Sequence, residues 1–143
     1  MLKDNIVNKI TVLDGITYFY DSVRQKWLST IHDVQFGINH RNIKNDRWLA
    51  NATGIYSNIM GCCIPKKGTI IRIILQAQHE TSCTFRIIAD NNVLFMPQLA
   101  DEAGKIIDVD IDFGENIALK CSLEISENII NYPTVILQYS YRL

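Results

Sequence analysis

Strict alternation of apolar and polar residues in two neighbouring segments constrains the fold of this chain more than any other feature. In "KIIDVDIDF", residues 105–113, four apolar side chains at every second position alternate with three aspartates. In "IALKCSLEI", residues 117–125, five apolar side chains at every second position alternate with residues that include a lysine, a serine and a glutamate. A period of two residues is typical of a β-strand with one buried face. Both segments are therefore predicted to be strands of a half-buried sheet.

The same alternation recurs along the chain, whereas no segment has the spacing of an amphipathic helix. It is found in three further apolar sets: Ile71, Ile73 and Leu75; Cys83, Phe85 and Ile87; and Val135, Leu137, Tyr139 and Tyr141. Turn-forming residues interrupt the pattern at 65–68, 79–82, 90–92, 101–104, 113–116 and 126–133. Turns at such regular spacing, between strands of about five to nine residues, predict an all-β fold, either an antiparallel sandwich or a barrel.

Length and charge limit the general class of the protein. A chain of 143 residues is long enough for one domain with its own core. Its 14 basic and 15 acidic residues leave a net charge of −1, so we expect no general attraction to nucleic acid or to an anionic membrane. No apolar run approaches the ~20 residues of a membrane span, and the N-terminal sequence "MLKDNIVNKI" lacks the apolar core of a signal peptide. We therefore expect synthesis in the cytoplasm.

No motif in the sequence indicates a metal, a cofactor or catalysis. The spacing of Cys62, Cys63, Cys83 and Cys121 fits neither a zinc ribbon nor a CxxC redox site, which favours free, buried thiols over disulfides. None of the three histidines has a second histidine at helical or alternating spacing, so we expect no metal site. The sequence also lacks the motifs of hydrolases, nucleotide-binding loops and dinucleotide-binding folds. The sequence therefore predicts a protein without cofactors that is not an enzyme.

The segment "DGITYFYDSVRQKWLST", residues 14–30, concentrates aromatic residues near the start of the chain. "ITYFY" and "QKWLST" flank "DSVR", in which an aspartate and a serine suit the opening of a turn, so a β-hairpin is predicted. Alternation places Tyr18 and Tyr20 on one face of it and Phe19 on the other. A two-stranded ribbon is only marginally stable in water. This ribbon is therefore expected to pack on the sandwich, on another subunit or on both.

The hairpin segment resembles a motif, DG-x-x-Y-x-YD-x-x-R-x-KWLS, of small structural and fibre proteins of tailed bacteriophages and other viruses. In those proteins a β-sandwich follows, and similar features follow here in the same order: "FG" at 36–37, "GCCIPKKGTI" at 61–70, "CTFRI" at 83–87 and "YPTVILQYSYR" at 132–142. The resemblance implies a jelly-roll domain similar to tumour necrosis factor and complement globular-head domains, which commonly form trimers. It also implies a viral structural protein located in the virion: a head-fibre, capsid-decoration or tail-fibre component. The chain has no long fibrous shaft, so it would be a compact knob, a decoration or one part of a fibre.

These observations predict two parts of the chain. Residues 1–30 would form an N-terminal attachment segment with the aromatic β-hairpin, and residues 31–143 an antiparallel jelly-roll β-sandwich. We expect a homotrimer that binds other virion proteins of the capsid, fibre or tail, made in the host cytoplasm without a signal peptide. The predicted assembly interface consists of Tyr18, Phe19, Tyr20, Trp27 and Leu28.

A second hypothesis makes the domain a receptor- or glycan-binding module at a fibre tip. Loops on a rigid sandwich often bind ligands, and the predicted contact surface comprises the loops around 40–48, 79–82 and 126–133. The candidate contact residues are Asn45, Arg47, Trp48, Tyr56 and Tyr132. A simpler interpretation, which we favour, makes the two tryptophans anchors of a core or a subunit interface. A third hypothesis, a depolymerase of surface sugars, would need two carboxylates across a cleft, whereas the acidic residues here are spread over outer strand faces.

Three aspartates, Asp108, Asp110 and Asp112, are the best candidates for binding an ion, because alternate residues of a strand project on one side. Neighbouring carboxylates on such a face are about 7 Å apart, too far for one calcium ion unless another strand or loop closes in. We therefore favour a solvated outer face over a calcium site. Arg72 and Arg86, on outward positions of other strands, are the predicted partners of this face.

Overall fold

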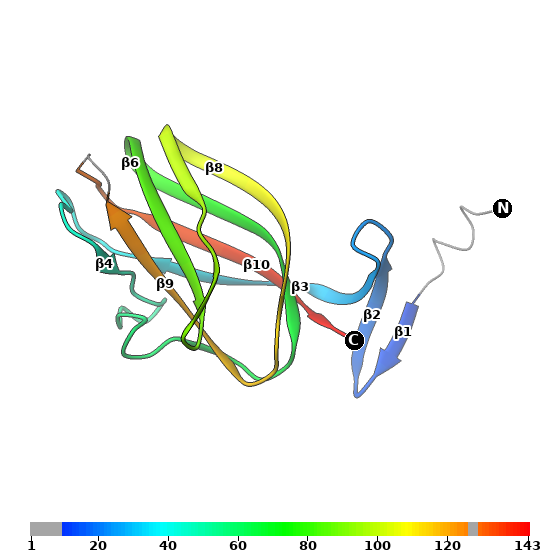
Figure 1. Ribbon diagram of the computed structural model, residues 1–143. Helices are drawn as coiled ribbons and strands as arrows, with labels where there is room; N and C mark the ends of the chain where they lie inside the picture. Colours follow the sequence, from blue (N-terminus) through cyan, green and yellow to red (C-terminus); the bar gives the residue numbers. More distant parts are fainter. Residues whose placement is uncertain (1–9, 126–128) are drawn as a thin grey trace.

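The computed structural model describes residues 10–125 and 129–143, and this part of the chain is built from antiparallel β-strands (Figure 1). The strands are β1 (Ile10–Leu13), β2 (Ile16–Asp21), β3 (Lys26–Gly37), β4 (Arg47–Trp48), β5 (Cys62–Ile64), β6 (Gly68–Ala89), β7 (Asn92–Phe95), β8 (Gln98–Phe113), β9 (Ile117–Ile125) and β10 (Thr134–Arg142). They form one hydrogen-bonded sheet that curls into two layers. None of the described segments forms a helix with the length and apolar character that a membrane span requires.

Two long strands, β6 and β8, bend and take part in both layers of the sandwich. The first part of β6, residues 68–76, pairs with β10, which pairs in turn with β3. The last part of β6, residues 83–89, pairs with β9, and β9 pairs with β4 and β5 on its other side. β8 follows β6 through the bend as its hairpin partner. This strand order is that of a jelly roll, so the predicted fold class is confirmed.

Two predicted turns are wrong, because their residues form the bend of the two long strands. Residues 79–82 lie inside β6, which runs for 22 residues, and residues 101–104 lie inside β8, which runs for 16. The expected strand length of about five to nine residues is therefore too short for both. The two segments face each other, since Gln76 pairs with Gly104 and the register shifts beyond this pair. Turn-forming residues on both strands thus let the hairpin fold over the core without ending either strand.

The core lies between the two layers and is lined largely by the residues that alternation predicts. Alternate residues of β9 and β10 are buried, namely Ile117, Leu119, Cys121, Leu123, Val135, Leu137 and Tyr139. In β8 the alternating residues Ile107, Val109, Ile111 and Phe113 belong to this core or pack against it, and the aspartates between them are exposed. The alternation fails in β6, where Ile70 rather than Ile71 is fully buried. The register of β6 against both β8 and β10 shifts at Ile71, and this bulge takes the residue out of the alternation.

The four cysteines are all free, but they are not all buried. Cys83 and Cys121 lie in the core, as their apolar neighbours predict, and burial raises the pKa of the Cys83 thiol to about 11. Cys62 is half-buried and Cys63 is exposed, so the expectation of buried thiols is wrong for this neighbouring pair. Both residues belong to the short strand β5, which covers part of β9 at the sheet edge.

The strands β1 and β2 form a hairpin that projects from one end of the sandwich (Figure 1). Asp14 and Gly15, with φ angles of 51° and 76°, form its two-residue turn. β2 then pairs with the start of β3. β3 runs through the boundary predicted between residues 30 and 31 and pairs with β10 as far as Gly37. One uninterrupted strand therefore connects the hairpin to the sandwich. Residues 1–9 of the predicted attachment segment lie outside the described residues.

Candidate functional site

The five residues predicted for assembly lie in three different environments of the hairpin. Tyr18 and Leu28 are buried within the chain itself, with exposed fractions of 5% and 6%. Tyr20 and Trp27 are half-buried and pack edge to face, with ring centroids 5.3 Å apart. Phe19 is 44% exposed. Of the five predicted residues, Phe19 therefore offers the largest exposed fraction to a partner.

Besides Phe19 of β2, three apolar side chains of β1 are exposed, and the sequence analysis did not predict these three as interface residues. Ile10, Val12 and Leu13 have exposed fractions of 54%, 64% and 51%. Ile10 lies directly opposite Phe19 in the pairing of β1 with β2, so these two side chains share one face of the hairpin with Val12. We call Ile10, Val12 and Phe19 the apolar hairpin face. The Asp-Gly pair at 14–15 was the overlooked signal, since it is typical of a two-residue turn between alternating segments.

β1 is also an edge strand. Within the described part of the chain it pairs with β2 alone, along one of its two sides. A strand edge of this kind presents N–H and C=O groups to which a further strand can bind. Natural proteins often block such edges with lysine, proline or a bulge, and the sequence "ITVL" of β1 contains neither of these residues. The apolar hairpin face and this edge together form a candidate attachment surface.

Arg24 fixes the turn between β2 and β3 to the outer face of the sandwich. The Asp21 carboxylate accepts hydrogen bonds from the backbone N–H groups of Val23 and Arg24 and so shapes the turn. The Arg24 guanidinium donates to the carbonyl oxygens of Val109 and Ile71 at 2.9–3.1 Å. Both carbonyls lie where the register of β6 against β8 shifts. Arg24 therefore joins the hairpin to the sandwich at an irregular point of its sheet.

Asp108, Asp110 and Asp112 of β8 bind basic side chains of the same chain. The Lys26 ammonium donates to the carboxylates of Asp110 and Asp112, and Arg72 donates to Asp108 at 2.7 Å. Burial alone would raise the pKa of Asp112, but the hydrogen bond from Lys26 helps to hold it below its usual value. The predicted pairing of Arg72 is therefore confirmed, and two of the three aspartates bind the first residue of β3.

Arg86, the second predicted partner of the aspartates, lies in the part of β6 that pairs with β9 and binds a different carboxylate. It pairs with Glu124, across β6 and β9, at 2.7 Å. The prediction that it binds the aspartate face is therefore wrong, because Arg86 belongs to the part of β6 that lies beyond the bend. Across residues 10–125 and 129–143, no group of three or more His, Cys, Asp or Glu side chains is placed to hold a metal ion.

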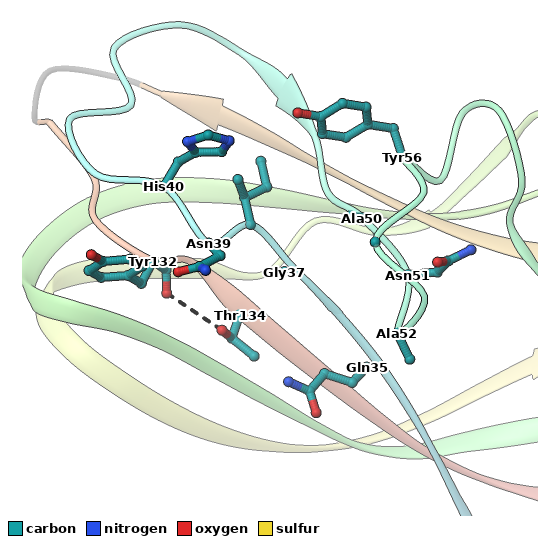
Figure 2. Close-up of a pocket in the computed structure, with 12 residues that line it drawn as sticks. Gln35, Gly37, Asn39, His40, Ala50, Asn51, Ala52, Tyr56, Tyr132 and Thr134 are labelled. Carbon is teal, nitrogen blue, oxygen red and sulfur yellow. Dashed lines mark hydrogen bonds between the residues drawn. The ribbon is translucent and has the colours of Figure 1, made fainter.

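An open groove, shown in Figure 2, lies at the end of the sandwich away from the hairpin of Figure 1. Its volume is about 580 Å³. Three segments line it: the end of β3 with the residues that follow, the loop 50–56, and residues 132–134 at the start of β10. The polar part of the lining includes the side-chain amides of Gln35, Asn39 and Asn51. The groove is therefore made by residues that are far apart in the sequence.

Two tyrosines of the groove are held in place by arginines. Arg41 Nε donates to the Tyr132 hydroxyl at 2.8 Å, and its guanidinium lies 5.7 Å from the centroid of that ring. Arg47 Nη2 donates to the Tyr56 hydroxyl at 2.7 Å, and its guanidinium also lies 5.7 Å from the ring centroid. Each pair combines a charge-assisted hydrogen bond with a cation–π contact. The two rings are thus fixed by their neighbours.

The structure separates the residues that the glycan hypothesis named. Tyr132 lines the groove. Arg47 and Trp48 line a second, smaller hollow of about 250 Å³, and Tyr56 borders both. Asn45 is exposed and lines neither the groove nor the hollow. The named residues therefore lie at one end of the sandwich but do not form a single site.

Sequence analysis missed Gln35 and Asn39. Nothing in the sequence shows that the end of β3 lies beside the start of β10, where Gly37 pairs with Thr134. Of the three predicted contact loops, the prediction for 79–82 is wrong because these residues are part of strand β6. In the loop at 126–133, residues 126–128 lie outside the described residues.

A comparison with models of known protein families finds no match, and a comparison with curated protein sequences finds none either. The function of this chain is therefore inferred from its residues and their geometry.

Proposed function

We propose that this chain is a structural protein of a virus particle and attaches to a capsid, fibre or tail protein through its N-terminal hairpin. One observation supports the attachment: the apolar hairpin face of Ile10, Val12 and Phe19 lies next to the edge of β1 that pairs with none of the described strands. The resemblance of residues 14–29 to segments of tailed-bacteriophage virion proteins supports the particle as the place of action. The jelly roll agrees with this role, since the fold is common in viral capsid proteins.

Attachment by strand addition follows from the geometry of the hairpin. A partner strand along β1 would gain backbone hydrogen bonds, and its alternate side chains would cover the apolar hairpin face. Each of the three side chains is about half exposed, so burying all three contributes about 3 kcal/mol. Bringing two proteins together costs more, about 4–15 kcal/mol. A single hairpin is therefore a weak anchor.

This weakness supports the proposal of a homotrimer. Three hairpins on one trimer would bind three equivalent sites of a symmetric particle, and the second and third contacts form at a high effective concentration. Weak contacts that are individually reversible then give firm attachment. The trimer itself is proposed from the resemblance to virion jelly rolls and places subunit contacts in the sandwich.

The attachment proposal is tested by replacing two side chains of the apolar hairpin face with charged ones. The double variant Ile10→Asp with Val12→Asp changes two exposed residues, so it should leave the fold intact. We expect its amount in purified particles, measured by quantitative mass spectrometry, to fall by about tenfold or more because the partner strand would bury two charges. Val93→Asp on β7, also an exposed apolar residue, is the matched control. A folded hairpin variant that enters particles like the wild type would contradict the proposal.

The oligomer is tested by light scattering of the full chain and of a variant that lacks residues 1–21. This deletion removes β1 and β2 and leaves β3 complete. We expect a trimer in both samples, since the proposed subunit contacts belong to the sandwich. A stable monomer of the full chain would contradict the trimer. A trimer that becomes a monomer after the deletion would show that the hairpin binds the chain's own subunits.

A further inference from the structure

The groove at the far end of the sandwich is separate from the attachment surface and has the dimensions of a ligand site. Ligand pockets of proteins have volumes of about 300–1,000 Å³, and this groove has about 580 Å³. No residue of β1 or β2 lines it. A ligand in the groove would therefore leave the hairpin available for the proposed attachment to the particle.

The groove has a rigid frame. Gly37 and Ala50 exchange two backbone hydrogen bonds of 2.9 Å, which join the end of β3 to the loop 50–56. The Tyr132 N–H donates to the His40 carbonyl at 2.9 Å, which joins the third segment. The Asn51 side-chain oxygen accepts hydrogen bonds from two backbone N–H groups and one hydroxyl of its own loop. The groove is therefore preformed, and a ligand need not order it on binding.

Two amide side chains in this frame have no hydrogen-bond partner among the described residues. They belong to Gln35 and Asn39, and Figure 2 shows both in the groove with the Tyr132 ring. Asn51 differs from them, because its amide oxygen accepts hydrogen bonds from its own loop and its amide nitrogen donates to the Met60 carbonyl. A free amide offers donors and an acceptor at adjacent positions. Such a group can bind two neighbouring hydroxyls of a ligand at once.

The charge of the lining narrows the class of ligand. None of its 12 described residues carries a carboxylate, an ammonium or a guanidinium group. The adjacent Arg41 and Arg47 are not among the lining residues, and each donates one hydrogen bond to a tyrosine hydroxyl, that of Tyr132 and that of Tyr56 respectively. A charge of opposite sign favours tight binding of a phosphate or carboxylate ligand, and the His40 imidazole is the one side chain among these 12 lining residues that can carry a positive charge. The groove suits an uncharged ligand that is rich in hydroxyl groups.

We propose that this groove binds a neutral oligosaccharide. Gln35 and Asn39 hydrogen-bond its hydroxyls, and the Tyr132 ring, held by Arg41, packs against the apolar face of a sugar unit. The groove is open to solvent, so further sugar units can extend out of it. This assignment uses none of the residues that carry the attachment proposal, and either can fail without the other.

The proposal is tested by nuclear magnetic resonance titration of the full chain with neutral disaccharides: maltose, cellobiose, lactose and chitobiose. We expect at least one of them, at millimolar concentration, to shift the side-chain amide signals of Gln35 and Asn39. Gln35→Ala and Asn39→Ala should each weaken this binding by about fivefold or more, the effect of losing one neutral hydrogen bond. The matched controls are Gln98→Ala and Asn91→Ala, which are exposed amides outside the groove.

Three outcomes would overturn the assignment. The first is that none of the disaccharides shifts the groove signals. The second is binding that the Gln35 and Asn39 variants leave unchanged, which would place the sugar elsewhere. The third is stronger binding of glucuronic acid, weakened by salt, which would make the ligand acidic. The double variant Ile10→Asp with Val12→Asp should bind the disaccharide like the wild type, which separates this test from that of attachment.

Discussion

Replacement of Arg24 by alanine tests whether the hairpin is held against the sandwich by one side chain. In the structure this guanidinium donates three hydrogen bonds to the carbonyl oxygens of Val109 and Ile71. It also pairs with Asp21 at 3.0 Å. The Arg24→Ala variant removes all of these contacts and leaves both carbonyls at the bulge without their donor. We expect the variant to fold but to be measurably less stable.

The size of this effect follows from the number of carbonyls and their access to water. A desolvated hydrogen bond from a charged group contributes about 1.5–3 kcal/mol. The Arg24 side chain is 21% exposed, so water can replace part of what is lost at each carbonyl. We therefore count about 1 kcal/mol for each of the two carbonyls, and little for the pair with Asp21, which water still reaches. The expected loss is about 2 kcal/mol, which lowers the Tm of a domain of this size by about 6–8 °C.

The measurement is urea unfolding of the wild type, of Arg24→Ala and of the matched control Arg72→Ala. Arg72 is also an arginine on the outer face of the sheet, but its pair with Asp108 is exposed at 47% and 67%. Such a pair contributes about 0.5 kcal/mol or less. If both variants lose the same stability within error, Arg24 does not hold the hairpin to the bulge, and the reasoning above is wrong.

Three further predictions concern other parts of the fold. The pKa of Asp112 is lowered in the folded chain, so the ionised carboxylate stabilises the fold above about pH 4, and this contribution is lost as the pH falls through the folded pKa. As the pH is lowered to 3, the urea midpoint of Asp112→Asn should therefore fall less than that of the wild type. Cys63 should react with a thiol reagent in the folded chain, whereas Cys121, whose burial raises its thiol pKa, should react only in denaturant; equal rates would contradict the burial. Gly68→Ala should lose about 1–3 kcal/mol in urea unfolding, because the added carbon would lie 2.5 Å from the Phe113 ring and 2.6 Å from the Ser140 carbonyl oxygen; unchanged stability would contradict this close packing.

Residues 105–113 of β8 and the strands β9 and β10 could be predicted from the sequence because each buries one face, and the alternation records that burial directly. The bend of β6 and β8 could not be predicted in the same way. Residues 79–82 and 101–104 have the composition of turns, and composition shows only where a chain can change direction. Whether the hydrogen bonding resumes beyond that point depends on the partner strand. The two longest strands were therefore predicted as shorter pieces.

The candidate sites were harder to predict, since they depend on contacts between distant residues. The turn at Asp21 was predicted from local composition, but the role of Arg24 depends on a bulge at Ile71 and Val109, which are 47 and 85 residues away. The groove has the same origin, because Gln35 becomes a lining residue only when β3 pairs with β10. Periodicity describes a strand and its buried face, and it contains no information about which strands are neighbours.

The strand β3 connects the two proposed sites, the attachment surface and the groove, and holds them at opposite ends of the sandwich. It begins at Lys26, whose ammonium binds the aspartates beside the hairpin, and it ends at Gly37, which lines the groove. At about 3.3 Å per residue its 12 residues separate the two sites by about 36 Å. Pairing with β10 along most of this length keeps the strand rigid. A domain held to a particle by its hairpin would therefore present the groove on the side that faces away from the particle, where an oligosaccharide can reach it.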